Sequence, residues 1–392
     1  KTLLAAEKDS SSGIDELLSN FLQQGELTQQ EKRWSMELVY GVTRMKLQLD
    51  AWIGIAFKGR YRKAQHAVKS LLRMGAFQLK YMHTSEHAAI NETVALSKRV
   101  KQAQASGLVN AVLRKLQKLE LEDLLNQSED DIQRLSIETS HPQWLLEKWI
   151  ARYTPDDVSA MCSRNNTAPQ TWVRRNIQIV GADEFEGFLD GLEIKHKKSE
   201  LLDVFYEIGS ASSLFSTKEF HEGWFSFQDL AAGVVASLLD PEAGDTIVDA
   251  CSAPGGKMAF MSELAGGQAK ITACDASQTR LAKVRENIQR LGLKQVEVQE
   301  LDAALAPLPK ANKILLDVPC SGTGVLNRRP DARWKRQESD ITSLVGIQSR
   351  ILTNSWKYLA PGGLLVYATC TLEPDENWEL IDSVLEQLDH AS

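Results

Sequence analysis

The 392-residue sequence has only five cysteines, widely spread, and no two of them form a C-x-x-C pair. This scarcity argues against a structural zinc site or a dithiol redox centre and suits a reducing compartment. The sequence also lacks an apolar run of about 18 residues and an N-terminal stretch of charged and then apolar residues. We therefore expect a cytoplasmic protein, outside the membrane and secreted classes, that works as a monomer without a metal.

Two common nucleotide-binding motifs are absent as well. There is no G-x-G-x-x-G, which disfavours a dehydrogenase. A P-loop is excluded because Lys257 is followed by Met258 after too short a glycine spacing. Any nucleotide-like cofactor must therefore be held by a different kind of turn.

Proline is missing from residues 13–119, where apolar residues recur at intervals of three and four. This pattern predicts an all-α domain over residues 1–135. Residues 136–222 mix helical and strand-like segments and read as a small α+β linker domain, and residues 223–392 form a third domain. A length of 392 residues supports two or three domains, because one hydrophobic core rarely serves so long a chain.

Charge is distributed unevenly along the chain. The net charge is −7, but residues 41–118 carry 15 Lys and Arg against three acids. One interpretation is a solvated helical surface that pairs with the acidic remainder, and the other is a module that binds a polyanion. The asymmetry keeps nucleic acid open as a partner despite the negative total.

Beyond residue 225, short apolar strands alternate with amphipathic helices. The predicted strands are residues 246–250, 270–275, 296–300, 313–318 and 364–369. This alternation predicts a doubly wound α/β domain with a parallel sheet and helices on both faces.

Acidic residues and glycines gather at the carboxyl ends of these strands. Gly255 and Gly256 follow the first strand and open a helix, whose free amides favour a carboxylate or a phosphate. Asp275 ends the second strand, where nucleotide-binding sheets place an acid for ribose hydroxyls, and Asp302 and Asp317 follow at strands three and four. We predict a site for an adenosine-containing cofactor; a tight turn with incidental acids is the alternative.

Cys320 and Cys370 follow the fourth and fifth strands. Neighbouring parallel strands lie about 4.8 Å apart, so both thiols can share one pocket. With a methyl donor bound nearby, a thiolate added to carbon 6 of a pyrimidine makes carbon 5 nucleophilic, and Asp317 is the nearest acid for the ring nitrogen N3. A helix predicted to start at residues 373–375 would favour the Cys370 thiolate, but strand position alone does not rank the two cysteines. We expect Cys162, Cys251 and Cys274 to be structural.

Three segments, CSAPGGK at 251–257, DVPCSGTG at 317–324 and YATC at 367–370, resemble the motifs of the Sun/NSUN family of RNA cytosine-C5 methyltransferases in order and spacing. The segments AINE at 89–92 and LVNAVLRK at 108–115 are similar to the NusB-like RNA-binding helical domain. The likeness covers nearly the whole chain and points to the bacterial members that methylate 16S ribosomal RNA. It implies a Rossmann-like class I methyltransferase domain preceded by an all-α NusB-like domain and a small α+β linker domain.

The resemblance also implies roles for single residues. Cys370 would bond to carbon 6 of the cytosine, Cys320 would help release the product, and Asp317 would assist catalysis. S-adenosylmethionine would be held by Cys251, Ser252, Ala253, Pro254, Gly255, Gly256, Lys257, Asp275, Arg280, Asp302 and Asp317. Members of the family normally complete the sheet with an antiparallel hairpin, so we expect the chain to be truncated after Ser392.

Residues 327–336 hold five cations and one acid and follow Cys320 closely. They predict an RNA-binding loop in which Trp334 stacks or packs, although an ordinary solvated loop would look the same. The predicted RNA contacts are Arg60, Arg62, Lys63, Arg114, Arg328, Arg329, Arg333 and Lys335. Two alternative functions stay open: an RNA-binding factor without catalysis, and a cytosine-C5 methyltransferase that acts on tRNA.

Overall fold

The computed structural model describes residues 1–8, 13–23, 27–209 and 213–388, and the chain divides into two compact units. The first unit comprises Lys1–Ala168 and Val325–Glu338, and the second comprises Pro169–Gly324 and Ser339–Ser392. The chain thus leaves the second unit after Gly324, adds a short segment to the first, and returns. No helix among the described residues is both long enough and apolar enough to span a bilayer. The expected truncation concerns Ser392, which lies outside the described residues.

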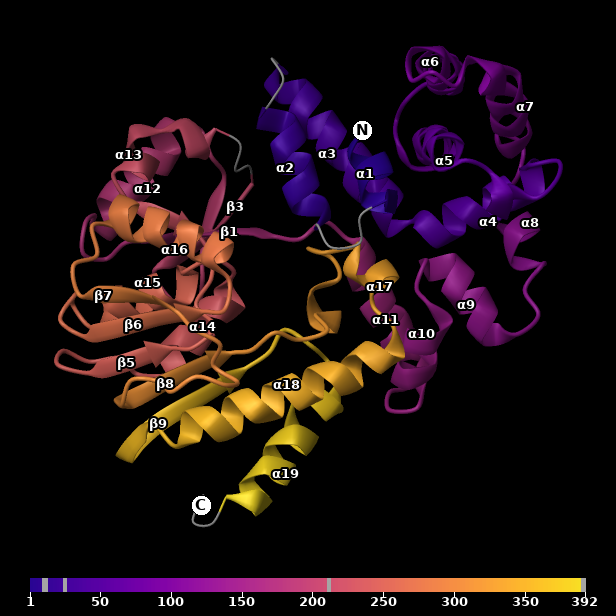
Figure 1. The fold of residues 1–392 in the computed structure, drawn as a ribbon. Coiled ribbons are helices and arrows are strands. Elements are labelled where there is room, and N and C mark those ends of the chain that lie inside the picture. Colours follow the sequence, from indigo (N-terminus) through magenta and orange to yellow (C-terminus); the bar gives the residue numbers. More distant parts are fainter. Residues whose placement is uncertain (9–12, 24–26, 210–212, 389–392) are drawn as a thin grey trace. The chain divides into compact units, whose positions relative to one another are not determined.

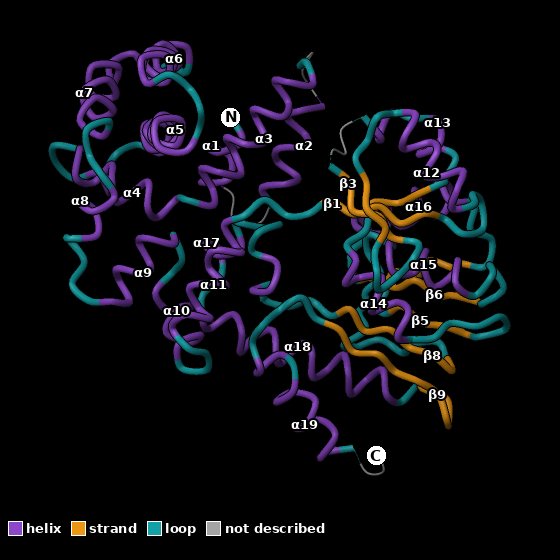
Figure 2. Tube along the Cα trace, turned by 180° about the vertical axis from the view of Figure 1, so that it is seen from behind, coloured by secondary structure: helices purple, strands orange, loops and turns teal. Residues whose placement is uncertain are grey.

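The first unit is helical, as the proline-free, periodic sequence predicts (Figures 1 and 2). Thr28 and Glu31 form a capping box that starts α3, in which each side chain accepts a hydrogen bond from the other residue's backbone amide. The main core gathers apolar side chains from α3 to α8. The helices are α1 (Thr2–Lys8), α2 (Ile14–Gln23), α3 (Gln29–Arg44), α4 (Lys46–Ala56), α5 (His66–Tyr81), α6 (Glu86–Arg99), α7 (Ser106–Leu116), α8 (Leu121–Leu125), α9 (Asp131–Thr139), α10 (Gln143–Ile150), α11 (Pro155–Asn166) and α17 (Ala332–Lys335), with 3-10 turns η1 (Tyr61–Lys63) and η2 (Ala103–Ala105).

The second unit begins with a four-stranded antiparallel sheet in the order β2-β3-β1-β4. Its strands are β1 (Thr171–Arg175), β2 (His196–Lys198), β3 (Phe205–Ile208) and β4 (Phe225–Phe227), and its helices are α12 (Ala182–Gly191) and α13 (Lys218–His221). Phe185, Tyr206 and Phe225 lie at the centre of its core. The predicted linker domain of residues 136–222 and the observed units have different boundaries. Helices α10 and α11 lie within this range but belong to the first unit, and β4 of the small sheet lies just beyond residue 222.

The larger sheet of the second unit is parallel, with the order β7-β6-β5-β8-β9, and Figure 1 shows the five strands side by side in that order. The strands are β5 (Thr246–Asp249), β6 (Lys270–Asp275), β7 (Val296–Glu300), β8 (Ala311–Asp317) and β9 (Leu359–Ala368). Strand β9 starts at Leu359, earlier than the predicted residue 364, and its pairing with β8 is irregular between these two positions.

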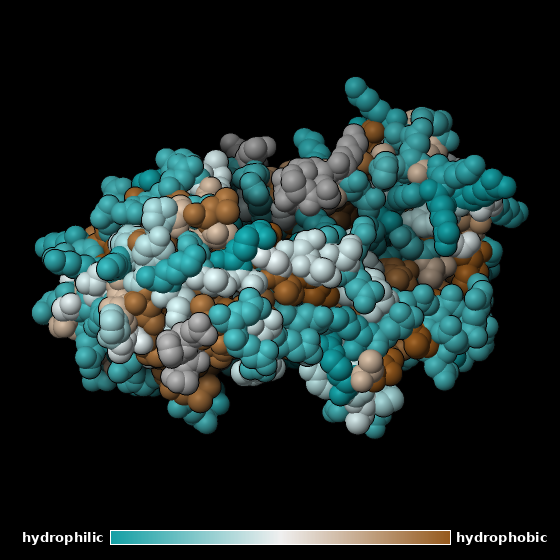
Figure 3. All heavy atoms as spheres, turned by 60° about the horizontal axis from the view of Figure 1, so that its bottom comes forward, coloured by the Kyte–Doolittle hydropathy of each residue, from teal (hydrophilic) through white to brown (hydrophobic). Residues whose placement is uncertain are grey.

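Helices cover both faces of this sheet, which confirms the predicted doubly wound arrangement. Alternate strand residues point to opposite sides: Ile247 packs with α14 (Leu230–Leu238), α15 (Gly256–Leu264) and α16 (Gln278–Leu291). Val248 packs on the other face with α18 (Glu338–Trp356) and α19 (Trp378–Gln387). On the face drawn in Figure 3, hydrophilic side chains predominate and apolar ones lie in groups between them.

The strand order reverses at β5, which pairs with β6 on one side and β8 on the other. In open α/β sheets, ligands bind outside the carboxyl ends of the strands at such a switch point. The loops after β5 and β8 are therefore the first place to look for a site.

Candidate active site

Cys320 and Cys370 are brought together by the pairing of β8 with β9. Asp317 at the end of β8 lies opposite Ala368 at the end of β9, so the two following loops leave the sheet side by side. The sulfur atoms of the two cysteines lie 3.2 Å apart, and the backbone amide of Cys370 donates to Sγ of Cys320 at 3.3 Å. Cys370 is exposed, whereas Cys320 is half-buried. The exposed sulfur is the one that a ligand can reach first.

The environment of the two thiols is asymmetric. The hydrogen bond with Cys370 and the burial of its sulfur both raise the pKa of the Cys320 thiol. Cys320 can therefore act as the hydrogen-bond donor to the neighbouring sulfur. Burial also raises the pKa of Cys162 to about 11, that of Cys274 to about 12 and that of Cys251 further still. These three thiols stay protonated at neutral pH.

The loop between β5 and α15 contains the predicted cofactor turn. Gly255 has a φ of +99°, a conformation that residues with a Cβ rarely adopt, and it directs the chain into α15. No side chain caps the start of this helix, so its first backbone amides remain available to an anion. The loop is anchored by a hydrogen bond from the Ser252 amide to the Cys274 carbonyl at 2.8 Å and by one from Asn287 Nδ2 to the Pro254 carbonyl at 3.0 Å.

The predicted acids lie at the strand ends with distinct partners. Asp317 pairs with Lys257 at 2.6 Å. Asp275 is buried, pairs with Arg280 at 2.8 Å and accepts a hydrogen bond from the Ser277 amide at 2.9 Å. Asp302 accepts from the Ala304 amide at 2.9 Å.

Asp249, the last residue of β5, is an acid to which sequence reasoning gave no role. It is 1% exposed, and burial together with the nearby Asp317 raises its pKa to about 7. Lys257, the Ser252 side chain and the Cys251 amide lie close by and lower this pKa in part. Within the described part of the chain, however, neither carboxyl oxygen of Asp249 has a hydrogen-bond partner. A buried, unsatisfied carboxyl group beside a glycine turn is suited to hold a cationic group of a ligand.

Glu376 was also missed by sequence reasoning. It is fully buried and accepts hydrogen bonds from Ser321 and Thr371, which directly follow the two cysteines, and from Gln348 on α18. In the sequence it stands in a polar run, TLEPDEN, that reads as an ordinary turn.

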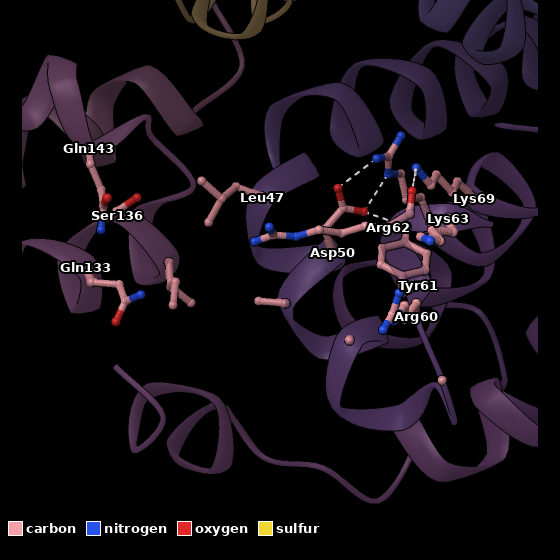
Figure 4. A pocket seen from close by; sticks show the side chains of 15 residues that line it. Leu47, Asp50, Arg60, Tyr61, Arg62, Lys63, Lys69, Gln133, Ser136 and Gln143 are labelled. Carbon is pink, nitrogen blue, oxygen red and sulfur yellow. Dashed lines mark hydrogen bonds and ion pairs between the residues drawn. The ribbon is translucent and has the colours of Figure 1, made fainter. Parts of the chain in front are cut away.

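A cavity of about 880 Å³ lies within the first unit, and several of the residues predicted to bind RNA line it (Figure 4). Asp50 bonds to the guanidinium of Arg73 at 2.6 Å through both carboxylate oxygens, and Tyr61 donates to it at 2.6 Å. The acid is thus already satisfied. The remaining charged side chains that line the cavity are cationic, namely Arg60, Arg62, Lys63 and Lys69.

The predicted RNA-binding loop at 327–336 belongs to the first unit, and the structure overturns one of its assignments. Arg333 is 1% exposed, so its guanidinium cannot meet a phosphate in this conformation. It donates instead to the carbonyls of Ser140 at 3.0 Å and Asn165 at 3.2 Å and to the side chain of Asn166 at 3.0 Å. This desolvation lowers the pKa of Arg333 to about 9.

The other cations of this loop and of α7 are less enclosed. Lys335 pairs with Asp331 at 3.0 Å, and Trp334 is half-buried. Its indole N–H donates to the Thr43 carbonyl at 2.5 Å, so this ring packs within the unit. Arg329 and Arg114 are exposed, and Arg328 is half-buried.

Three family models match the chain. The family described as 16S rRNA methyltransferase RsmB/F matches residues 236–392, the NusB family matches residues 2–118, and the ferredoxin-like domain of RsmF/B-like methyltransferases matches residues 141–204. The second match agrees with the predicted NusB-like domain. The third covers part of the four-stranded sheet and the helices before it.

Curated relatives match over nearly the full length. Ribosomal RNA small subunit methyltransferase B of Enterobacter sp. (strain 638) is 34% identical over 381 residues, which are 96% of this chain and 87% of that relative. The protein of the same name from Erwinia tasmaniensis is 37% identical over 355 residues, 90% of this chain and 81% of that relative.

Solved structures share the fold. The crystal structure of PH0851 superimposes with a TM-score of 0.85 at 22% identity, covering 99% of this chain and 88% of that one. A methyltransferase homologue from Pyrococcus horikoshii gives a TM-score of 0.60 at 25% identity, covering 67% of this chain and 84% of that one. With more than a third of positions identical to one relative and four fifths or more of each relative covered, this chain belongs to the family of the ribosomal RNA small subunit methyltransferases B.

Proposed function

We propose that the protein transfers a methyl group from S-adenosylmethionine to carbon 5 of a cytosine in 16S ribosomal RNA, through a transient bond between Cys370 and carbon 6 of the base. The observation that carries this proposal is the pair of sulfur atoms 3.2 Å apart at the ends of β8 and β9. Methylation of a nitrogen or an oxygen needs no thiol, whereas carbon 5 of a pyrimidine becomes nucleophilic only after such an addition.

The residues around the β5–α15 loop fit S-adenosylmethionine. The uncapped amides at the start of α15 suit its carboxylate, and the unsatisfied carboxyl group of Asp249 suits its ammonium group. Asp275 would accept from the ribose hydroxyls, and Asp302 would be a further contact at the same edge of the sheet. Bound here, the cofactor supplies an electrophilic methyl group. The predicted contacts of Cys251–Lys257 and Arg280 remain part of this proposal.

The side chains of the protein would then act on the base. The Cys370 thiolate forms a bond to carbon 6, and the electron pair of the C5–C6 double bond moves towards the ring nitrogen N3. Asp317 accepts a hydrogen bond from Lys257 at 2.6 Å and is the proposed acid that stabilises the adduct at the ring nitrogen N3. After carbon 5 has been methylated it loses its proton to a base, and the bond between Cys370 and carbon 6 breaks. Cys320, hydrogen-bonded to Cys370, would assist this release.

The cationic cavity of the first unit supports RNA as the substrate. Arg60, Arg62 and Lys63 are exposed along one short segment and line the same hollow (Figure 4). Clustered cations of this kind hold phosphates without reading sequence. Arg114, Arg328 and Arg329 would add further contacts. Lys335 would contribute less to RNA binding, because it is paired with Asp331.

The direct test is methyl transfer by the purified protein to RNA from cells that lack it, followed by bisulfite mapping of 16S ribosomal RNA and tRNA. We expect one new 5-methylcytosine in 16S ribosomal RNA. A new mark in tRNA would instead support the tRNA alternative. Binding of RNA without any methyl transfer would support the non-catalytic alternative and overturn the proposal.

A further inference from the structure

Glu376 is a buried carboxylate that connects the two cysteine-bearing loops. Its Oε1 accepts from the Ser321 amide at 2.8 Å and from Gln348 Nε2 at 2.9 Å. Its Oε2 accepts from the Ser321 hydroxyl and from the Thr371 hydroxyl, the latter at 2.9 Å. The donors therefore come from the loop after β8, the loop after β9 and helix α18.

Burial of the Glu376 side chain costs free energy unless its carboxyl oxygens are hydrogen-bonded. Glu376 is 0% exposed, and its hydrogen bonds come from neutral donors, namely Ser321, Gln348 and Thr371. Burying a carboxylate costs several kcal/mol, which only a full set of hydrogen bonds offsets. Four donors supply that set. Loss of any of these hydrogen bonds would leave a buried carboxyl oxygen less satisfied and lower the stability of the two loops.

The hydrogen bonds of Glu376 act one residue away from each sulfur. Ser321 follows Cys320 and Thr371 follows Cys370, and the two hydroxyl oxygens lie 2.7 Å from each other. Gln348 donates through the same amide group to the Pro319 carbonyl at 2.9 Å, so the segment is held on both sides of Cys320.

Backbone contacts close the connection between the two loops. The Gly324 amide donates to the Cys370 carbonyl at 3.0 Å, and a Cβ at Gly324 would lie only 3.0 Å from that oxygen. Tyr367 donates to the carbonyl of Glu376 at 2.9 Å, which fixes the carboxylate's own backbone to β9.

We propose that Glu376 is a positioning residue that holds Cys320 and Cys370 in register for the covalent step, an inference that rests on the proposed function. It holds both loops through its hydrogen bonds to Ser321 and Thr371, and its charge also raises the pKa of the Cys320 thiol. Bond formation at carbon 6 needs the attacking sulfur in a near-attack position, and a displacement of about 1 Å costs about 100-fold in rate.

Glu376→Ala removes all four hydrogen bonds. We expect turnover to fall about 100-fold while the Kd for S-adenosylmethionine changes less than about threefold, because the β5–α15 loop is untouched. RNA containing 5-fluorocytosine measures the covalent step itself, because fluorine at carbon 5 cannot leave as a proton and the adduct persists. The rate of adduct formation should fall in parallel with turnover.

Glu376→Gln is the conservative variant that should restore most of the activity. Its amide oxygen can accept from the Ser321 and Gln348 N–H groups, and its NH2 can donate to the hydroxyls of Ser321 and Thr371, which can rotate to accept. Glu379→Ala is the matched control, because this exposed carboxylate lies on the next turn and should leave turnover at the wild-type value.

The pH profile of iodoacetamide alkylation separates positioning from simple folding. Glu376→Gln removes the charge that raises the pKa of the Cys320 thiol but keeps the hydrogen bonds. Loss of register should therefore move the apparent pKa of the reactive thiol in Glu376→Ala away from its value in Glu376→Gln, whereas equal profiles in the two variants would contradict positioning. Should Glu376→Ala fail to fold, Ser321→Ala and Thr371→Val each remove one donor and should lower turnover without loss of cofactor binding.

The outcomes divide clearly. Wild-type turnover in Glu376→Ala, or in both single-donor variants, overturns the inference, as does a parallel loss of turnover and cofactor affinity in all three. A wild-type protein that methylates no RNA means instead that the proposed function has failed, whatever the variants do.

Discussion

Cys320 and Cys370 are 50 positions apart in the sequence, yet their sulfur atoms lie 3.2 Å from each other with Cys370 as the exposed member. The shared hydrogen bond and burial raise the pKa of the Cys320 thiol, so the two sulfur atoms have different environments. This asymmetry, with Cys370 as the exposed sulfur, supports the proposal that Cys370 is the attacking thiol.

The ranking predicts different failures for the two variants. Cys370→Ala should reduce methyl transfer below detection and form no covalent RNA adduct, because the attacking sulfur is gone. Cys320→Ala should still form the adduct and accumulate it, visible as a slow-migrating band on a denaturing gel. Cys162→Ala, a buried thiol of the first unit, is the control. Adduct formation by the Cys370→Ala protein would exchange the two roles.

The cationic cavity predicts a change in salt dependence. Neutralising Arg60, Arg62 and Lys63 to Gln should weaken RNA binding and reduce the slope of log K against log salt by about 2 to 3, because each lost phosphate contact removes about 0.7 to 0.9. Binding is measured by titration at several salt concentrations.

A second triple variant controls for net charge. Lys98, Arg99 and Lys101 are exposed in the same unit but do not line the cavity. Replacing these three by Gln should change the slope by less than one. Equal effects of both triple variants would mean that the charge of the unit matters and that the cavity itself does not.

Asp249→Asn should stabilise the protein without cofactor and weaken cofactor binding. The folded-state pKa of about 7 lies above the ordinary value of 3.8, so folding takes up a proton between these values and stability falls as pH rises through that window. The gain in melting temperature from Asn should therefore be largest above pH 7 and absent below pH 4. Thermal unfolding between pH 4 and 8 measures it.

The same carboxyl group predicts the pH dependence of cofactor affinity in the wild type. If Asp249 binds the ammonium group as a carboxylate, the Kd for S-adenosylmethionine should rise as pH falls below about 7, approaching tenfold per unit. Calorimetry at pH 5.5 to 8 tests this, and Asp249→Asn should abolish the dependence. A Kd that is flat in the wild type would remove Asp249 from the site.

Arg174 on β1 predicts a stability effect far from the sulfurs. It forms a buried ion pair with Glu263 on α15 at 2.5 Å and donates to the Gly256 carbonyl at 3.1 Å. Arg174→Met should cost about 3 to 5 kcal/mol, because Glu263 is left buried and unpaired. Urea unfolding measures the loss. The double variant Arg174→Met with Glu263→Leu should recover much of it, and no recovery would mean that the bonds to Gly256 and Gln228 dominate.

The parallel sheet could be predicted closely, because buried strands appear as short apolar runs between turn residues. Residues 270–275 and 296–300 were predicted with the bounds that β6 and β7 have. Strand β9 was predicted five residues short, because Pro361, Gly362 and Gly363 look like a turn, whereas the structure continues the strand through them. In a parallel sheet the loops that follow neighbouring strands leave at the same edge, so Cys320 and Cys370 could be placed close together from the sequence.

The roles of Arg333 and Glu376 could not be predicted in the same way. A run of five cations looks like a solvated loop, and the carbonyls that bury Arg333 come from residues more than 160 positions earlier. Glu376 stands in a polar turn, and its donors come from Ser321, Gln348 and Thr371, so nothing local distinguishes it from the neighbouring acids. Long-range contacts of polar groups leave no periodic pattern in a sequence.

The return of residues 325–338 to the first unit bears on the order of events during synthesis. The carbonyls of Ser140 and Asn165 accept hydrogen bonds from Arg333, which is synthesised more than 160 residues later. Leu326 completes the small apolar cluster around Trp149 from the same late segment. The first unit therefore reaches its final packing only after most of the chain has been synthesised. A fragment ending at residue 168 would lack Arg333 and Leu326 and would leave the carbonyls of Ser140 and Asn165 without these hydrogen bonds.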